Sequence, residues 1–463
     1  MTHSSDSFSE LALRPELLGA LQNLNFTAMT PIQAQSVPFI LNGDDLIAQA
    51  KTGSGKTVAF GLGLLQKLEP KWFSTQALVL CPTRELAEQV ATEIRKLASQ
   101  IENVKLLTLC GGTPFKPQAA SLEYGAHIVV GTPGRVEDHV KRGTLFLDDL
   151  NVLVLDEADR MLEMGFEESL TTIIEQTPDE RQSLLFSATF PDSIQQLAAH
   201  ILQNPQHVKV ESVHNDNAIR QHFYQVANEA ERQKAVKLVL LAHQTTSAVV
   251  FCNTKREVQD LTDDLKTQGF SAVALHGDLE QRERDQTLIQ FANQSATVLV
   301  ATDVAARGLD IDSVEVVINY HLAHDPEVHI HRIGRTGRAG KSGFACSLIS
   351  DKQNYKVALL EEALGFEIET EALPDDSVLM QRPIKAPMVT LQIDGGKKSK
   401  IRPGDILGAL TGDGGIAGDQ VGKIKVTAMR SYVAVSKNVS QQALNQLNHG
   451  KLKGRKTRAR FLN

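Results

Sequence analysis

Two sets of short, almost entirely aliphatic runs follow one another along the chain, and this repeated pattern limits the fold more than any other feature. The runs are Ala77–Thr83, His127–Pro133, Val152–Ala158 and Ser183–Thr189 in the first set, and Ala248–Thr254, Ala272–Asp278, Ala296–Asp303 and Glu315–Tyr320 in the second. Runs of this kind are typical of parallel strands buried on both faces. The segments between them, such as 84–100, carry apolar residues at helical spacing. The pattern therefore predicts two successive α/β domains with parallel sheets.

The length of 463 residues also requires more than one hydrophobic core, because single cores stop growing near ~250–300 residues. We expect a first domain over 1–210, a second over 218–372, a linker over 373–386 that is rich in proline and charge, and a small C-terminal domain over 387–463. The polar stretch 211–217 would join the first two domains. No apolar run approaches the ~20 residues needed to span a bilayer, and the polar N-terminus lacks the features of a signal peptide. We therefore expect a cytoplasmic protein.

Charge is distributed unevenly between the C-terminal segment and the rest of the chain. Residues 387–463 contain 14 lysines and arginines but only 4 acidic residues, a balance of +10 in a chain whose net charge is −7. Residues 1–386 therefore carry −17. A basic segment attached to an acidic body indicates that the segment binds a polyanion, although charge alone also fits a solvated tail.

Cysteines and histidines do not form a recognisable metal motif. The four cysteines are far apart and include no CxxC pair; they are Cys81, Cys110, Cys252 and Cys346. Four histidines lie near one another without a completing cysteine or carboxylate set; they are His321, His324, His329 and His331. Tetrahedral metal sites need such a set, so we expect buried free thiols and no metal bound by the histidines.

The strongest single motif is the glycine-rich segment AKTGSGKT over 50–57, which follows a strand-like run. Such a segment lets backbone N–H groups surround phosphate oxygens at a helix N-terminus. In this pattern Lys56 reaches the β- and γ-phosphates, and the Thr57 hydroxyl binds Mg²⁺. The predicted nucleotide-binding residues are Lys51, Thr52, Gly53, Ser54, Gly55, Lys56 and Thr57. Alanine replaces glycine at position 50, and the alternative is a glycine-rich turn that only enters a helix.

An acidic cluster, Asp156-Glu157-Ala158-Asp159, follows an aliphatic strand-like run. Its carboxylates are therefore expected at the carboxyl end of a buried strand, where α/β sheets bind ligands. We expect Asp156 to hold Mg²⁺ through water and Glu157 to orient or deprotonate the attacking water. A solvated acidic loop is the alternative, which the preceding strand and the upstream phosphate loop disfavour.

At these residues the chain resembles the DEAD-box RNA helicases, and the other motifs of that family follow in order. The resemblance covers about residues 8–370 and implies two tandem RecA-like domains. Phe8 and Gln33 match the motif that reads adenine, although Asn25 stands where that motif usually has glycine. Ser187–Thr189 matches the motif that couples hydrolysis to domain closure. The RNA-backbone contacts that the resemblance implies in the first domain are Pro82, Thr83, Arg84, Gly112, Thr132, Pro133, Gly134 and Arg135.

The later motifs of the family appear in the second set of strands. Segment 301–310 implies RNA contacts at Thr302 and Gly308, a contact between Asp310 and the ATP ribose, and pairing of Arg307 with the acidic cluster. Segment 331–338 makes Arg335 and Arg338 the arginine fingers. Guanidinium charge at a transferred phosphoryl group is worth roughly 10³–10⁵ in rate. If these arginines lie on the second domain, RNA that bridges both domains should favour closure and stimulate hydrolysis of ATP.

The C-terminal 77 residues match one small α+β module. Their order is a strand, a basic loop, a helix, two strands, a second helix and a basic tail. This order resembles the RNA recognition motif, in the divergent form carried by bacterial helicases of the same family, and implies binding of a 23S rRNA hairpin. The sheet offers one candidate stacking ring, Tyr432, which could instead be a plain sheet residue. The residues expected to bind RNA here are Lys397, Lys398, Lys400, Arg402, Tyr432, Lys451, Lys453 and Arg455.

These features together predict an ATP- and Mg²⁺-dependent RNA helicase that unwinds rRNA locally during assembly of the large ribosomal subunit. Its expected partner is 23S rRNA in a subunit precursor, with no membrane and no DNA, and we expect a monomer. One alternative is an ATP-gated RNA clamp or assembly scaffold with little unwinding, which the complete hydrolysis motifs disfavour. A DNA-directed helicase is a further alternative, which the appended RNA module disfavours.

Overall fold

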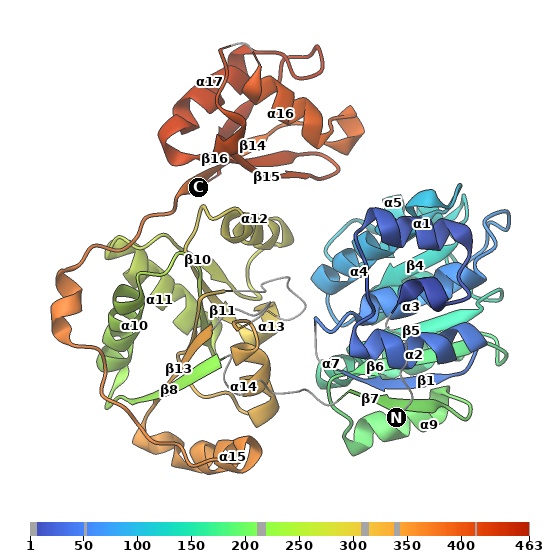
Figure 1. Ribbon diagram of the computed structural model, residues 1–463, viewed down its shortest axis with the longest axis horizontal. Coiled ribbons are helices and arrows are strands. Elements are labelled where there is room, and N and C mark those ends of the chain that lie inside the picture. Colours follow the sequence, from blue (N-terminus) through green and yellow to red (C-terminus); the bar gives the residue numbers. More distant parts are fainter. Residues whose placement is uncertain are drawn as a thin grey trace. The chain divides into compact units, whose positions relative to one another are not determined.

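A computed structural model describes residues 7–50, 53–210, 219–306, 314–337, 343–412 and 414–462 (Figure 1). The described residues form two compact units, the first ending at residue 210 and the second beginning at residue 219. The expected connection at 211–217 lies outside the described residues. All eight predicted aliphatic runs contain a strand. The parallel α/β architecture predicted for both domains is therefore confirmed.

The first domain is built on a seven-stranded sheet in which every strand pairs in parallel, in the order β3-β4-β2-β5-β6-β1-β7. Its strands are β1 (Leu46–Gln49), β2 (Ala77–Leu80), β3 (Leu106–Leu109), β4 (Ile128–Gly131), β5 (Val152–Asp156), β6 (Gln182–Ser187) and β7 (Gln206–Lys209). Its helices are α1 (Pro15–Asn23), α2 (Pro31–Asn42), α3 (Lys56–Lys67), α4 (Arg84–Leu97), α5 (Phe115–Leu122), α6 (Pro133–Lys141), α7 (Ala158–Glu163), α8 (Glu167–Ile174) and α9 (Asp192–Ile201).

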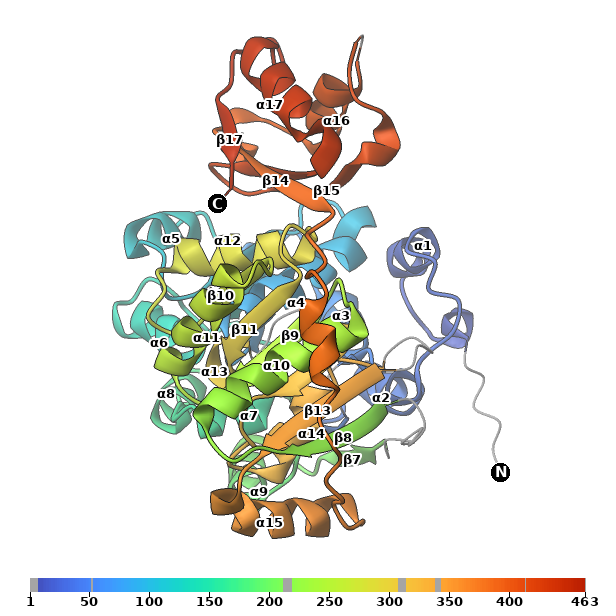
Figure 2. The ribbon, with the colours of Figure 1, turned by 90° about the vertical axis from the view of Figure 1, so that its left-hand side faces the viewer.

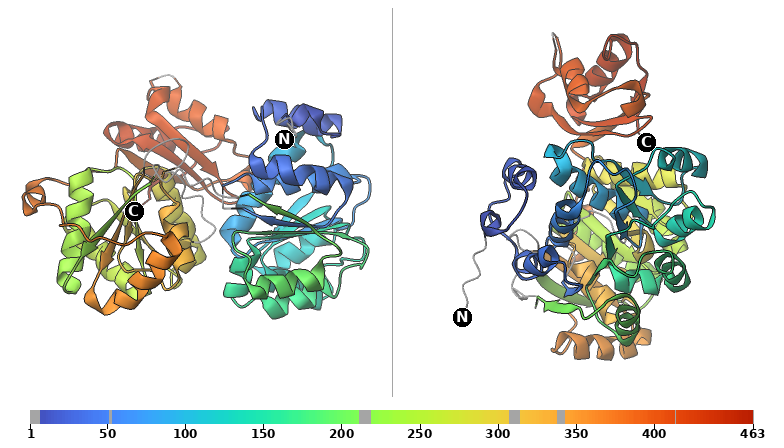
Figure 3. Two further views of the ribbon diagram at one scale, coloured as in Figure 1. Left: turned by 60° about the horizontal axis from the view of Figure 1, so that its bottom comes forward. Right: turned by 90° about the vertical axis from the view of Figure 1, so that its right-hand side faces the viewer.

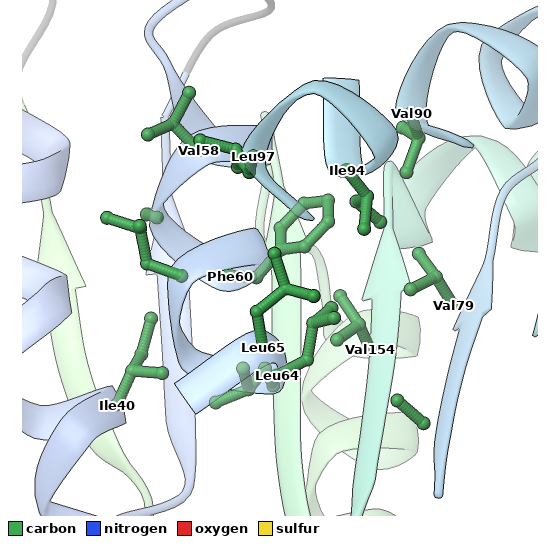
Figure 4. Close-up of a cluster of buried hydrophobic side chains, with 14 of the residues drawn as sticks. Ile40, Val58, Phe60, Leu64, Leu65, Val79, Val90, Ile94, Leu97 and Val154 are labelled. Atoms are coloured by element: carbon green, nitrogen blue, oxygen red, sulfur yellow. The ribbon is translucent and has the colours of Figure 1, made fainter. Parts of the chain in front are cut away.

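Both faces of this sheet are covered by helices, which the left view of Figure 3 shows. One apolar core lies between the sheet and helices α1 to α4, and the other lies against α6, α8 and α9. In the first core, Phe60 of α3 packs against Phe186 of β6 with 5.3 Å between ring centroids, and Figure 4 shows Phe60 among side chains from α3, α4 and the strands. Burial on both faces explains why the strands read as unbroken aliphatic runs.

The second domain repeats this design with six parallel strands in the order β10-β11-β9-β12-β13-β8. Its strands are β8 (Ile219–Gln225), β9 (Ala248–Cys252), β10 (Ala272–Leu275), β11 (Val298–Thr302), β12 (Val316–Asn319) and β13 (Gly343–Ile349). Its helices are α10 (Glu229–His243), α11 (Lys255–Thr267), α12 (Gln281–Ala292), α13 (Asp303–Ala306), α14 (Pro326–Ile333) and α15 (Asn354–Leu364). In Figure 1 the strands lie between α10 and α11 on one side and α13 and α14 on the other.

The segment expected as a linker, 373–386, runs along the second domain. Leu373 and Val378 pack on the core of that domain. Asp376 forms an ion pair with Lys234 at 2.6 Å, and Lys385 donates to the backbone of the same domain. Apolar and polar contacts therefore hold this segment against the domain.

The C-terminal domain is a four-stranded antiparallel sheet, in the order β15-β16-β14-β17, with two helices on one face (Figure 2). Its elements are β14 (Met388–Ile393), α16 (Pro403–Thr411), β15 (Val421–Val426), β16 (Ser431–Ser436), α17 (Ser440–His449) and β17 (Ala459–Phe461). The sequence predicted this order up to α17, but it missed β17, which lies in the segment expected as a basic tail. Alternating charge in that segment hid a strand whose pairing with β14 depends on the folded sheet.

The four cysteines are buried free thiols, as expected. No cluster of histidine, cysteine and carboxylate groups suited to a metal ion occurs among the described residues. Within the same residues, no helix is long and apolar enough to cross a membrane.

Candidate active site

The carboxyl ends of the parallel strands divide the sequence motifs of the first domain into two neighbouring groups. The strands β5, β6 and β1, which are adjacent in the sheet, lead into the acidic cluster, the Ser187–Thr189 segment and the glycine-rich loop. The strands β3, β4 and β2 form the other half of the sheet and lead into the segments expected to contact RNA. Ligands bind at this edge of open α/β sheets. The fold thus places the predicted nucleotide site beside the edge that is predicted to contact RNA.

The glycine-rich loop enters α3 through two glycines with left-handed backbones. Gly53 has φ of +80° and Gly55 has φ of +96°, a region that glycine occupies without steric cost. Lys56 begins the helix, is 5% exposed, and donates from Nζ to the backbone oxygen of Ala50 at 3.0 Å. A buried ammonium at a helix N-terminus is suited to bind phosphate oxygens. Lys51 and Thr52 lie outside the described residues.

The start of α2 holds this loop in place. Thr30 Oγ1 donates to the backbone oxygen of Ser54 at 2.7 Å, and Gln33 Nε2 donates to that of Gly55 at 3.0 Å. The backbone N–H of Thr30 donates to Gln33 Oε1, which completes a capping box. Gln33 was predicted to bind adenine, and its amide is 2% exposed in these contacts. Thr30 was not among the predicted residues, although the T-x-x-Q capping pattern before an apolar helix could have identified it.

Asp156 ends β5 and is almost fully buried. Its Oδ1 atom has no hydrogen-bond partner among the described residues. Burial raises the pKa of Asp156 to about 6, against the opposing attraction of Lys56. Hard divalent cations prefer carboxylate and hydroxyl oxygens, and the unsatisfied Oδ1 together with Thr57 at the start of α3 offers this donor type. The residues present therefore fit Mg²⁺.

Replacing Asp156 by asparagine should stabilise the first domain in the absence of metal. The pKa of this carboxyl is raised from 3.8 to about 6 on folding, so the folded state loses stability as pH rises through that interval. One pKa unit is worth ~1.4 kcal/mol, and the variant should gain about 2–3 kcal/mol near pH 7. Trp72, the one tryptophan of the chain, lies in the first domain, so its fluorescence can follow denaturant unfolding in EDTA. If wild type and Asp156→Asn had the same free energy of unfolding at pH 7 as well as at pH 4, the predicted destabilisation by the ionised carboxyl would be wrong.

The last acidic residue of the cluster connects it to the segment after β6. Asp159 Oδ2 accepts hydrogen bonds from the backbone N–H of Ala188 at 3.2 Å, and from the N–H and hydroxyl of Thr189 at 3.0 and 3.1 Å. The N–H of Asp159 donates to Ser187 Oγ at 3.3 Å. Asp159 is 4% exposed, and charge-assisted bonds in such a setting are strong. These bonds fix the acidic cluster against the segment that follows β6.

The RNA-motif residues of the first domain lie together at the other half of the sheet edge. Thr83 caps α4 by accepting from the N–H of Leu86, and Arg84 is the first residue of that helix. Thr132 stands at the start of α6, and Arg135 donates to the backbone oxygen of Thr113 at 2.9 Å. Helix N-termini and backbone N–H groups are common phosphate contacts. The remaining predicted residues at the same strand ends are Pro82, Gly112, Pro133 and Gly134.

In the second domain, Thr302 ends β11 and Arg335 follows α14 by two residues. Arg335 is fixed through its backbone: its N–H donates to the oxygen of Arg332 at 3.1 Å, and its own oxygen accepts from Val314 N–H at 3.1 Å. Some of the predicted site residues lie outside the described residues, and these are Arg307, Gly308, Asp310 and Arg338.

The basic residues of the C-terminal domain come from two segments that the fold brings together. Lys453 Nζ donates to the backbone oxygen of Lys400 at 2.7 Å and lies 3.7 Å from a carboxylate oxygen of Asp405. Loop 397–400 is thereby joined to segment 451–455. We call the surface formed by these two segments the basic surface; its lysines and arginine are Lys397, Lys398, Lys400, Lys451, Lys453 and Arg455. Arg402 follows the loop directly, at the start of α16.

Tyr432, predicted to stack on RNA, is 4% exposed. It lies opposite Gln392 in the β14–β16 ladder, on the sheet face away from the helices. Residues of this face bond to the second domain: Gln286 Nε2 donates to Gln392 Oε1 at 2.9 Å, and Asn293 Nδ2 to Thr390 Oγ1 at 3.1 Å. The ring therefore has no open face for a base in this arrangement.

Comparison with known proteins agrees with this geometry. Residues 30–197 match the DEAD/DEAH box helicase family model, residues 230–340 match the helicase conserved C-terminal domain, and residues 390–461 match the DbpA RNA binding domain. The ATP-dependent RNA helicase DbpA of Escherichia coli is 51% identical over 98% of this chain and 99% of its own length. The chain belongs to the DEAD-box family of helicases. The Bacillus subtilis protein DbpA is 36% identical over the same shares of the two chains.

Solved structures of DEAD-box relatives share the fold of the core. Saccharomyces cerevisiae Dbp5 bound to RNA and ADP BeF3 is 34% identical, with a TM-score of 0.72, and the match covers 81% of this chain and 97% of that one. A single-residue variant of Dbp5 with the same ligands gives a TM-score of 0.73 at 33% identity. The two α/β domains are therefore RecA-like, and the protein is an ATP-dependent RNA helicase with a C-terminal RNA-binding domain.

Proposed function

We propose that this DEAD-box helicase unwinds 23S rRNA locally during assembly of the large ribosomal subunit, as a cytoplasmic monomer anchored through its basic surface. The observation that carries this proposal is the joining of loop 397–400 to segment 451–455 by Lys453. This bond brings two segments with six cationic side chains together on one small domain, in a chain of net charge −7. Similarity to the RNA helicase DbpA over nearly the full chain supports RNA as the substrate, and the choice of 23S rRNA rests on the resemblance of residues 387–463 to the divergent RNA recognition motif.

We assign the chemistry of the nucleotide site to four groups. Lys56 holds the β- and γ-phosphates, Glu157 orients the attacking water and accepts its proton, and Arg335 and Arg338 stabilise charge on the transferred phosphoryl group. Asp156 and Thr57 would hold Mg²⁺, which neutralises phosphate charge when bound. Phe8, Gln33 and Asp310 position the base and ribose.

RNA dependence follows from the separation of these groups between two domains. The phosphate loop and Glu157 belong to the first, whereas Arg335 belongs to the second. An RNA strand that contacts Arg84 and Arg135 in one domain and Thr302 in the other stabilises the closed state by its differential affinity for that state. Hydrolysis of ATP is therefore coupled to RNA binding.

The central experiment measures ATP hydrolysis with no RNA, with a 23S rRNA hairpin fragment and with an unrelated RNA of equal length. We expect the hairpin fragment to stimulate hydrolysis most at limiting RNA concentration. Equal rates with and without RNA would exclude RNA-driven closure. Equal stimulation by both RNAs at low concentration would exclude targeting to the hairpin while leaving the helicase activity intact.

A clamp that holds RNA with little unwinding is the second candidate function. The observation that distinguishes a clamp from a helicase is the set of bonds that Asp159 accepts from Ala188 and Thr189. These bonds connect the acidic cluster to the segment after β6, which by resemblance links hydrolysis to domain closure, and they therefore favour the helicase. A strand-displacement assay on a short duplex beside the hairpin separates the two functions, because a clamp binds without releasing a strand. The same duplex in deoxyribose form tests the preference for RNA.

Removing Lys397 and Lys398 together should weaken the salt dependence of RNA binding. Each phosphate contact to a single strand contributes about −0.7 to the slope of log affinity against log salt concentration. Alanine at both positions should therefore reduce the magnitude of that slope by about 1.4, measured by fluorescence anisotropy over several salt concentrations. Alanine at Lys423 and Lys437 is the matched control, because it removes the same charge from the same domain. Equal slopes for the two double variants would contradict the assignment of the basic surface.

A further inference from the structure

The second domain contains a fully buried arginine, Arg332, to which the proposed mechanism gives no role. It lies on α14 within segment 331–338 and is 2% exposed. Its Nε and Nη2 atoms donate to the two carboxylate oxygens of Asp303 at 2.6 Å each. Bidentate pairs of this kind fix the relative position of their partners as well as stabilising them.

The remaining donors of Arg332 reach the ends of two further strands. Nη2 donates to Asn253 Oδ1 at 3.1 Å, and Nη1 donates to the backbone oxygen of His321 at 2.8 Å and to Asn319 Oδ1 at 3.3 Å. The guanidinium also lies over the ring of Phe251, 5.3 Å from its centroid. Every nitrogen of this buried group therefore has a partner.

These partners come from three strands that are neighbours in the sheet. Asp303 follows β11, Asn253 follows β9, and Asn319 ends β12, and the sheet order places β11, β9 and β12 side by side. One side chain thus connects the carboxyl ends of three adjacent strands. This edge is where an open α/β sheet presents its ligand-binding groups.

Two of the connected segments carry functional residues in the proposed mechanism. Asp303 directly follows Thr302, the proposed RNA contact. Arg332 lies one turn before Arg335, whose N–H donates to the backbone oxygen of Arg332. The bond between Asp303 and Arg332 is thus a short rigid link between an RNA contact and an arginine finger.

We infer that Arg332 is a positioning residue that sets Arg335 relative to the RNA-contacting end of β11, so that RNA binding places the finger correctly. This inference rests on the proposed function of Arg335 and Thr302. Small displacements of a catalytic group, of order 1 Å, can lower rates by about 10²-fold. Lysine keeps the charge of Arg332 but lacks the planar fork that joins Asp303, Asn253 and the end of β12.

The test compares Arg332→Lys with Arg232→Lys in the full chain. Arg232 is the matched control, because it is 3% exposed in the same domain and also donates to backbone oxygens. Its acceptors are the oxygens of Tyr320 and Leu348, the latter at 2.7 Å, and they lie in neither the Thr302–Asp303 segment nor segment 331–338. We expect Arg332→Lys to lower kcat at saturating RNA and ATP by about 10–100-fold, with the KM for ATP within about twofold of wild type. Arg232→Lys should lower the melting temperature to a similar degree and keep kcat within about twofold.

Unchanged kcat in Arg332→Lys would overturn the inference, and so would an equal fall of kcat in Arg232→Lys at the same melting temperature. If Arg332→Lys fails to fold, Asn253→Ala tests the inference in its place, because this variant removes a single hydrogen-bond acceptor of the Arg332 guanidinium. A fall of kcat of about threefold or more in Asn253→Ala supports positioning, and no change rejects it. Wild-type protein without RNA-stimulated hydrolysis would instead contradict the proposed function itself.

Discussion

Arg335→Ala should lower the rate of RNA-stimulated ATP hydrolysis by about 10³–10⁵-fold, because guanidinium charge at the transferred phosphoryl group contributes that much where enzymes use it. Binding of ATP should persist, since Lys56 and the glycine-rich loop belong to the first domain. The measurement is single-turnover hydrolysis at saturating RNA, with nucleotide affinity determined separately by a fluorescent ATP analogue.

The control for this variant is Arg256→Ala. The Arg256 side chain is 92% exposed on α11 and pairs with Asp260 on the same helix, so its loss should leave hydrolysis within about twofold of wild type. Arg335→Lys adds a second test, because a point charge without the planar fork should recover only part of the rate. A rate for Arg335→Ala within tenfold of wild type would show that Arg335 does not stabilise the transition state of hydrolysis.

Glu157→Gln should lower the same rate by about 10²–10⁴-fold, the range usual for a positioned general base. Glu157 is 8% exposed and has φ of +54°, in the left-handed region. Residues other than glycine occupy that region at a cost of roughly 1 kcal/mol or more, and such outliers concentrate at functional sites. Glutamine keeps the shape of the side chain and adopts the same backbone, so the loss should appear in kcat and not in stability.

Glu168→Gln is the matched control for that variant, because Glu168 is an exposed carboxylate of the same domain on α8. It should hydrolyse ATP at the wild-type rate. We also expect the Glu157→Gln protein to bind duplex RNA and ATP together without displacing a strand. That result would show that binding of the duplex does not require hydrolysis of ATP. Hydrolysis by Glu157→Gln at more than a tenth of the wild-type rate would show that another group orients the water.

Stability and the proposed function place opposite demands on Asp156, the predicted ligand of Mg²⁺. The buried Oδ1 atom of Asp156 has no partner among the described residues, and burial raises the pKa of its carboxyl. The protein therefore carries a destabilising carboxylate that Mg²⁺ would satisfy. The expected gain in stability of Asp156→Asn, together with loss of hydrolysis, follows from the same unsatisfied atom.

Parts of the site that depend on a contiguous segment were predictable from the sequence. The glycines at 53 and 55 require left-handed backbones, the lysine that follows them begins a helix, and an aliphatic strand presents the acidic cluster at its end. Each of these features depends on residues that are close neighbours in the chain. The family resemblance added the predicted roles of Gln33 and Arg335, which no local pattern reveals.

Contacts between distant segments were not predictable, and three features that depend on them differ from the sequence-based predictions. Thr30 holds the glycine-rich loop from a helix 24 residues away, and β17 completes the C-terminal sheet by pairing with β14, far upstream. Tyr432 has the residue type of a base-stacking ring but lies on a sheet face that contacts α12. Composition and periodicity do not specify which face of a short sheet a neighbour covers.

The sequence by itself determined the two parallel α/β domains, the phosphate loop and the acidic cluster, because apolar periodicity and glycine conformation act within one element or its flanking turn. The tertiary structure decided which of those elements contact one another. The order of strands in each sheet sets which chain segments meet, so it alone joins Asp159 to Thr189 and Arg332 to Asp303. Burial then makes these bonds strong, since charged groups removed from water require close partners.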